Sequence, residues 1–128
     1  MNPVKEDFRF RRKEHLKGRE DIRGVFKKGR VVSCPGAKLF IQKNDLPHNR
    51  MAFTFIRKYG NAVERNRARR LSREAYRLIR NSLKTGFDMV LLLYPGKDVF
   101  DTRIEQLKIL FSKAAVSKDL PAAEQGRR

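Results

Sequence analysis

Residues 55–77 read FIRKYGNAVERNRARRLSREAYR, and this stretch joins the end of one predicted element to most of the next. Gly60 and Asn61 interrupt the apolar–polar alternation that precedes them, and a helical pattern follows. The pattern continues until Thr85 and Gly86 end it. The sequence therefore predicts a strand, a short break and a long helix, in that order.

The predicted helix has two contrasting faces when its residues are placed at about 100° per residue. One face is apolar, and we expect it to pack on a sheet through Ala68, Leu71, Ala75, Leu78 and Ile79. The opposite face carries a basic row, flanked by Arg65 and Arg67, that consists of Asn66, Arg69, Arg70, Arg73, Arg77 and Arg80. Guanidinium groups bind phosphate oxygens through paired hydrogen bonds, so this row favours a nucleic-acid partner.

The charge balance of residues 57–80 is unusual for an exposed helix. They hold nine basic side chains and two acidic ones, Glu64 and Glu74. Like charges at helical spacing repel each other, so the row costs helix stability unless an anion faces it. A solvated face is the alternative interpretation, but exposed helices usually mix both signs of charge.

The flanking segments predict a small sheet. Residues 37–43 and 51–57 alternate in a period of two, and the turn-forming link at 44–49 predicts that they pair as an antiparallel hairpin. Residues 89–94 are continuously apolar, which favours a strand covered on both faces.

Two further helices are predicted. A first, short helix lies between Gly18 and Gly29, with acids at its start and lysines at its end. The last helix is expected to begin with a capping box of Thr102 and Glu105 and to continue to about Val116.

The resulting order, αββαβα, indicates an α+β fold, a two-layer sandwich of a small mixed β-sheet with helices. We expect a single RNA-binding domain over residues 18–116. A basic irregular arm is expected over residues 1–17, and a frayed tail over residues 117–128.

The composition narrows the class of protein. The chain has 128 residues, 40% of them hydrophobic, and a net charge of +17, which favours a polyanionic partner. No apolar run approaches the roughly 20 residues that span a bilayer. The first residues lack the apolar core of a secretory signal, and the single cysteine, Cys34, cannot form an internal disulfide, so we expect a cytoplasmic protein.

No protein-held metal and no catalytic side chain are expected. Cys34, His15 and His48 are too few and too distant for a zinc site. Both histidines stand in polar or turn segments without a nearby acid pair, which is typical of solvated surface histidines. Glu64 and Glu74 lie on differing faces of the predicted helix, so they do not form a pair for magnesium.

Residues 55–77 resemble the signature of the protein subunit of bacterial ribonuclease P, which reads roughly GNAVxRNxxKRxxRExxR after a strand ending in basic residues. Arg69 stands where the family commonly has lysine. The chain keeps Gly60, Asn61, Ala62, Val63, Arg65, Asn66, Arg70, Arg73 and Glu74 of this pattern, and Arg67 completes the family's RNR segment. Residues 20–30 (EDIRGVFKKGR) and 90–96 (VLLLYPG) are similar to the family's first helix and later strand.

In that family the protein assists a catalytic RNA that removes the 5′ leader of precursor transfer RNA by magnesium-dependent hydrolysis. The resemblance implies the same role here, with ribonuclease P RNA and precursor tRNA as partners and no obligate protein partner. It implies that the RNA carries the chemistry and holds most of the Mg²⁺. It also implies a left-handed crossover through the long helix, although right-handed connections are far commoner, and the residues leave this open.

Two RNA-binding surfaces follow from the resemblance. The first would contact the catalytic RNA through Lys58, Asn61, Arg65, Asn66, Arg67, Arg69, Arg70 and Arg73, to which the basic row adds Arg77. The second is a cleft between the first helix and the sheet that would hold the leader, with Ile22, Phe26 and Phe40, beside which Lys38 lies on the same side of its strand.

The strand pattern bears on the cleft independently of the resemblance. Phe40 alternates onto the polar side of its strand with Lys38 and Gln42, where an aromatic ring can stack on an unpaired base. Core packing is the alternative for Phe40, and the helical spacing of Phe26 favours core packing. Ile22 departs from the aromatic residue that the family often carries there, which leaves an apolar contact in place of stacking.

A structural RNA-binding protein, such as a ribosomal component, is the alternative function, because that class shares high positive charge and α+β folds. The spacing within residues 55–77 distinguishes the two. A helix-turn-helix DNA binder fits less well, because the basic helix follows a strand rather than a short partner helix.

Overall fold

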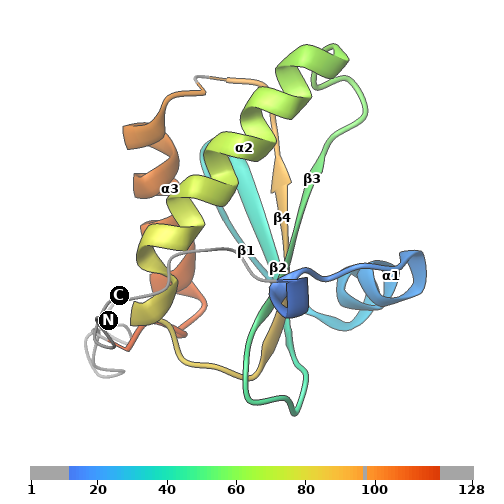
Figure 1. Cartoon of the computed structure of the whole chain (residues 1–128), viewed down its shortest axis with the longest axis vertical. Helices are drawn as coiled ribbons and strands as arrows, with labels where there is room; N and C mark the ends of the chain where they lie inside the picture. Colours follow the sequence, from blue (N-terminus) through green and yellow to red (C-terminus); the bar gives the residue numbers. More distant parts are fainter. Residues whose placement is uncertain (1–11, 97, 119–128) are drawn as a thin grey trace, which may run out of the picture.

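A computed structural model describes residues 12–96 and 98–118, which contain four strands, three α-helices and two 3₁₀ helices (Figure 1). The helices are η1 (Arg12–Glu14), α1 (Arg19–Lys28), α2 (Ala62–Ile79), η2 (Arg80–Ser82) and α3 (Phe100–Lys113), η1 and η2 being 3₁₀. The strands are β1 (Arg30–Cys34), β2 (Ala37–Lys43), β3 (Arg50–Phe55) and β4 (Phe87–Leu93). They form one mixed sheet in the order β1-β2-β4-β3.

The position of β4 corrects the predicted hairpin. β2 and β3 do not pair with each other, because β4 lies between them, antiparallel to β2 and parallel to β3. Met89, Val90 and Leu91 are fully buried, so this strand is covered on both faces as its apolar run predicted. Such a strand is best placed inside the sheet, and the turn-rich link at 44–49 therefore joins two strands that are not neighbours.

β1 is a strand that the sequence pattern does not predict, so the observed order is αβββαβα. It pairs with β2 through a tight turn at Pro35 and Gly36, whose φ of 87° suits glycine. Most of its side chains are exposed or half-buried, and Val31 is 53% exposed, so it lacks the buried alternation of a core strand. The α+β class with a small mixed sheet is confirmed.

The sheet has helices on both faces (Figure 1). α2 and α3 pack on one face over the main core, to which β2 contributes Leu39 and Ile41. α1 packs on the other face, where a smaller cluster gathers around Val25 and Val90. The alternation of β2 therefore divides its side chains between two cores, and Phe40 belongs to the smaller one.

The connection β3–α2–β4 joins two parallel neighbouring strands, and its handedness remains a prediction.

α3 begins at Phe100 after Val99, which makes no side-chain cap. The predicted capping box of Thr102 is therefore wrong, because Thr102 already lies in the first turn of the helix. No helix within the described ranges combines the length and the apolar composition needed to cross a membrane.

The packed structure extends beyond the predicted ends of the domain. The η1 helix lies within the predicted irregular arm, and His15 pairs with Met51 beside β3. At the other end, Ser117 pairs with Leu83. The rest of the predicted arm and tail, residues 1–11 and 119–128, lies outside the described residues.

A polar network ties the start of α3 to the turn before α2. The hydroxyl of Tyr59 donates to the carboxylate of Asp98, 2.6 Å from Oδ2, and Asp98 also forms an ion pair with the buried Arg103. Burial, together with the hydrogen bond to Asp98, raises the pKa of Tyr59 to about 12. This network fixes the loop from which α2 begins.

Candidate nucleic-acid interface

α2 begins with a fully formed capping box. The side-chain oxygen of Asn61 accepts a hydrogen bond from the backbone N–H of Glu64 at 2.8 Å, and the Glu64 carboxylate accepts from the Asn61 N–H at 3.0 Å. Gly60 precedes it with a φ of 155°, and a Cβ there would lie 2.2 Å from Glu64 Oε1. Gly60, Asn61 and Glu64 together thus start the helix. The resemblance assigned the Asn61 side chain to RNA binding, and in the structure this side chain also caps the helix.

Four of the predicted RNA-binding residues outside the cap are exposed: Lys58, Asn66, Arg67 and Arg70. Neither Arg67 nor Arg70 has a side-chain partner in residues 12–96 and 98–118. Because they are exposed and unpaired within these residues, the two guanidinium groups are available to a polyanion. They lie three positions apart on the helix, so they repel each other, and a bound anion would relieve that repulsion.

Arg69 is held in place by its neighbours. Its guanidinium lies over the ring of Phe55, with Cζ 5.1 Å from the ring centroid, and its Nη1 donates to Asn66 Oδ1 at 3.0 Å. An open hollow of about 410 Å³ is lined by Asn66, Arg69, Arg70 and Arg73. The structure therefore brings these four predicted residues together, and the Nε of Arg73 is buried without a partner in the described part of the chain.

Arg65 and Arg77 carry further local contacts. Arg65 Nη1 donates to the carbonyl of Gly60, so this side chain also supports the loop before the helix. Arg77 is paired with Glu74 at 2.9 Å, one helical turn away. Both lie half-buried along α2, so they are less available than Arg67 and Arg70.

The buried face of α2 differs from the predicted one. Leu78 is 45% exposed and Leu71 only half-buried, whereas Ser72 and Tyr76 are buried with Ala68 and Ala75. The buried face is shifted toward Tyr76 because its large ring packs in the core, and Ser72 is small enough to be buried on the same face. Tyr76 is in ring contact with Phe53 and Phe111. A pattern of apolar residues alone cannot reveal that Ser72 and Tyr76 are buried, because both side chains carry hydroxyl groups.

Arg80, which the sequence placed in the basic row, does not belong to the open surface. Its Nη1 lies 2.6 Å from Glu14 Oε1, and its side chain is only 9% exposed. The partner lies 66 positions earlier in the chain. No local pattern can predict such a pair.

The second predicted surface is also assembled. Ile22 and Phe26 of α1 pack with Phe40 of β2 against the smaller core. The rings of Phe26 and Phe40 meet edge to face with centroids 4.7 Å apart, and both remain half-buried. Lys38 is exposed on the same side of β2, with Nζ 5.9 Å from the centre of the Tyr94 ring. What this face binds stays a prediction.

The donor set around α2 is unsuited to a metal ion. Most of its exposed polar groups are guanidinium and amide groups, whereas Mg²⁺ prefers carboxylate, carbonyl and water oxygens. Its two carboxylates, Glu64 and Glu74, lie ten positions apart and are held by the Asn61 N–H and by Arg77. Within the described ranges, no three His, Cys, Asp or Glu side chains are grouped so that they could hold a metal.

The comparison with protein families decides the affiliation of this chain. Residues 10–115 match the family model Ribonuclease P. The chain belongs to the ribonuclease P family. The matched range spans the capping box, the basic row of α2 and the α1–β2 face that was predicted to bind the leader.

Relatives within the ribonuclease P family cover most of the chain. A protein named ribonuclease P protein component from Alkaliphilus metalliredigens is 40% identical over 81 residues, which are 63% of this chain and 73% of the relative. Another of the same name from Dictyoglomus thermophilum is 31% identical over 106 residues, 83% of this chain and 88% of the relative.

Solved structures of ribonuclease P proteins share the fold. The protein from Thermotoga maritima superposes with a TM-score of 0.68 at 28% identity, covering 84% of this chain and 98% of that one. The protein from Staphylococcus aureus gives a TM-score of 0.73 at 21% identity, covering 81% and 97%.

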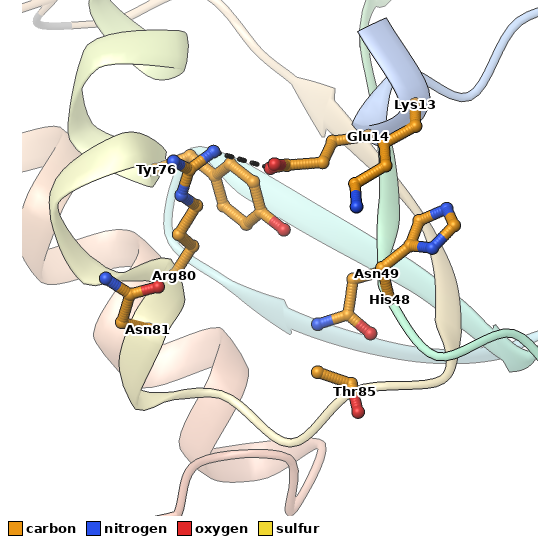
Figure 2. A pocket seen from close by; sticks show the side chains of 8 residues that line it. All are labelled: Lys13, Glu14, His48, Asn49, Tyr76, Arg80, Asn81 and Thr85. Carbon is orange, nitrogen blue, oxygen red and sulfur yellow. Dashed lines mark hydrogen bonds and ion pairs between the residues drawn. The ribbon is translucent and has the colours of Figure 1, made fainter. Parts of the chain in front are cut away.

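Sequence reasoning about this ribonuclease P family member missed a second hollow, away from the one on α2. It lies between η1, the link at 44–49 and the C-terminal end of α2 (Figure 2). His48, interpreted from the sequence as a solvated surface histidine, lines it together with Lys13. These residues come from segments far apart in the chain, so no spacing pattern could reveal them. Tyr94 beside Lys38 was also missed, because it ends an apolar run that looked purely structural.

Proposed function

We propose that this chain is the protein component of ribonuclease P and assists an RNA-catalysed endonucleolytic removal of the 5′ leader from precursor tRNA. The proposal is carried by the guanidinium groups of Arg67 and Arg70, which are exposed and have no partner among the described residues. They lie on a helix within the range that matches the family. The alternative of a ribosomal component is not favoured by the family match.

The basic side of α2 binds the catalytic RNA in this proposal. Arg69 is oriented by Phe55 and Asn66 before any RNA arrives, so less conformational entropy is lost on binding. Arg70 and Arg67 supply charge that lowers the repulsion between RNA phosphates.

The cleft of α1 and β2 binds the leader. The Phe26–Phe40 pair presents a half-buried aromatic surface beside the ammonium group of Lys38. Aromatic rings accept unpaired bases of any sequence by stacking, and a nearby cation attracts the backbone. This combination suits a single-stranded leader better than the duplex parts of a folded tRNA.

Magnesium is not assigned to the protein. The donor set on α2 does not fit Mg²⁺, so in this proposal the catalytic RNA and its phosphates hold the ion and perform the hydrolysis. The protein contributes binding and positioning, without an obligate protein partner, in the cytoplasm.

Reconstitution tests the proposal directly. Adding this protein to a bacterial ribonuclease P RNA at limiting magnesium should increase release of the leader, and the protein alone should release none. Cleavage at the mature 5′ end by purified protein without RNA would refute the division of labour. Copurification with ribosomal RNA without any stimulation of leader release would favour the ribosomal alternative.

An arginine variant tests the surface itself. Arg70→Ala should weaken binding to the catalytic RNA by roughly threefold to tenfold without unfolding the domain, because Arg70 is exposed and makes no hydrogen bond or ion pair within the described residues. Lys108→Ala removes the same charge from α3 and should have a smaller effect. Arg65→Ala is less clean, because Arg65 also bonds the carbonyl of Gly60.

A further inference from the structure

The hollow at the C-terminal end of α2 has the dimensions of a ligand site. Its volume is about 480 Å³, and Figure 2 shows side chains from three separate parts of the chain turned toward it. Lys13 and Glu14 come from η1, Asn49 from the link before β3, and Arg80 from η2.

Part of its lining is already committed to the fold. Glu14 and Arg80 neutralise each other through their ion pair, and their side chains are 14% and 9% exposed. Asn49 donates to the carbonyl of Lys84 at 2.8 Å and accepts from the N–H of Phe87 at 2.9 Å. These groups form the rigid walls of the hollow.

The remaining polar groups are free to bind a ligand. Lys13, Asn81 and Thr85 are exposed at the rim, and His48 is half-buried. None of these four side chains has a partner in residues 12–96 and 98–118. An ammonium, an amide and a hydroxyl are groups that proteins commonly direct at the phosphates and sugars of nucleic acids. The ring of Tyr76 is 1% exposed, so it offers no face for a stacked base.

The location of the hollow indicates which RNA reaches it. Arg69 and Arg73 lie on the flank of α2 that continues, one and two turns later, to Tyr76 and Arg80. Arg80 lies eleven positions after Arg69, roughly 17 Å along a helix. An RNA backbone that lies along this flank therefore extends to the hollow, whereas the leader cleft of α1 lies on the other face of the sheet.

We propose that this hollow binds a phosphate and its adjacent ribose in the backbone of the catalytic RNA, so that the interface continues past the end of α2. Lys13 supplies the charge, and Asn81 and Thr85 donate hydrogen bonds. The buried Glu14–Arg80 pair positions η1 so that Lys13 faces the site. This inference rests on the proposed function, because it requires that the chain binds the catalytic RNA.

Binding titrations at several salt concentrations test the site. Lys13→Ala should weaken binding of the whole protein to the catalytic RNA by roughly threefold to tenfold. It should also lower the slope of log affinity against log salt by about 0.7 to 0.9, the contribution of one phosphate contact. Thr85→Val keeps the side-chain shape and should weaken binding by about twofold to fivefold, with the salt slope unchanged. Lys108→Ala on α3 is the charge-matched control and should leave the slope unchanged.

The outcomes separate this site from the proposed function. Wild-type binding together with unchanged affinity and slope in both Lys13→Ala and Thr85→Val would overturn the site and leave the proposed function standing. A wild-type protein that neither binds the catalytic RNA nor stimulates leader release would overturn both.

Crosslinking identifies the RNA in contact. Cys34 is the only cysteine, so Cys34→Ser combined with Thr85→Cys allows a photoreactive group to be attached beside the hollow, with Cys34→Ser alone as the unlabelled control. In the reconstituted holoenzyme with precursor tRNA, crosslinks to the catalytic RNA would support the proposal. Crosslinks to the precursor alone, or to neither RNA, would contradict it.

Discussion

The guanidinium of Arg69 lies 5.1 Å from the centre of the Phe55 ring, so the last residue of β3 fixes an arginine of α2. A cation–π contact at a partly exposed site contributes roughly 0.5–1 kcal/mol. In the proposed function its importance is that Arg69 is oriented before RNA binds, together with Asn66 at the edge of the basic hollow.

Replacing this ring should therefore weaken RNA binding through Arg69. Phe55→Leu keeps an apolar side chain but removes the π face, and we expect about twofold to fivefold lower affinity for the catalytic RNA. Binding should be measured well below the unfolding temperature, since Phe55 also packs against Tyr59. In an Arg69→Ala background the same substitution should have little further effect. Additive losses in the double variant would mean that Phe55 acts independently of Arg69.

Gly60 is required by two features of the helix start. Its φ of 155° is rarely adopted by other residues, and an added Cβ would lie 2.2 Å from Glu64 Oε1. Gly60→Ala should lower the free energy of unfolding by about 1–3 kcal/mol, as measured by urea denaturation. The loss should be smaller in a Glu64→Ala background, where the clashing carboxylate is gone.

Gly24 provides the matched control. It lies inside α1, and a Cβ there would meet nothing within 4 Å. Gly24→Ala should raise stability by about 0.5–1 kcal/mol, because alanine loses less backbone entropy in a helix. A Gly60→Ala variant as stable as the wild type would show that the capping loop relaxes without strain.

The elements that depend on neighbouring residues could be predicted from the sequence. α2 follows from the break at Gly60 and Asn61 and from a long helical pattern, and β4 follows from its apolar run. The alternation of β2 also placed Phe40 on the side opposite Leu39 and Ile41, as the structure has it. In each case a period of 2 or 3.6 residues determines the direction of the side chains.

Features that depend on distant segments could not be predicted. β4 lies between β2 and β3, where a hairpin was predicted, because β4 is buried on both faces. That burial is a property of the whole domain. The shift in the buried face of α2 follows from the packing of Tyr76 against Phe111 on α3. The pairing of Arg80 with Glu14 and the hollow beside it require η1, which the sequence assigned to an irregular arm.

Phe40 tests the leader cleft. Phe40→Leu retains apolar packing against Phe26 but removes the ring, and it should weaken binding of precursor tRNA to the holoenzyme by about fivefold or more. Mature tRNA, which has no leader, should bind as before. Ile109→Ala, an exposed apolar residue of α3 on the other side of the sheet, is the control and should change neither. Equal losses for precursor and mature tRNA would assign Phe40 to the core alone.

Tyr59 should make the fold sensitive to alkaline pH. Its pKa is raised to about 12, mainly by burial and then by the hydrogen bond to Asp98, whereas an unfolded tyrosine titrates near 10. Between these values the unfolded chain loses the phenolic proton while the folded chain keeps it. Stability should therefore be unaffected by this group below about pH 10 and should fall as the pH rises toward 12, by up to about 1.4 kcal/mol per pH unit. Burial also raises the pKa of Tyr76, which acts in the same direction.

Tyr59→Phe isolates the contribution of this hydroxyl. At about pH 8 the variant should be less stable by roughly 1–2 kcal/mol, because the hydrogen bond to Asp98 is lost. Above about pH 10 its stability should fall less steeply than that of the wild type, because one proton fewer is lost on unfolding. Urea denaturation at a series of pH values measures both effects, and Tyr94→Phe is the control that leaves the Tyr59–Asp98 bond intact. The contrary result is the same slope of unfolding free energy against pH above pH 10 in the wild type and Tyr59→Phe. The loop before α2 would then open before Tyr59 ionises, and the network with Asp98 would not fix the start of α2.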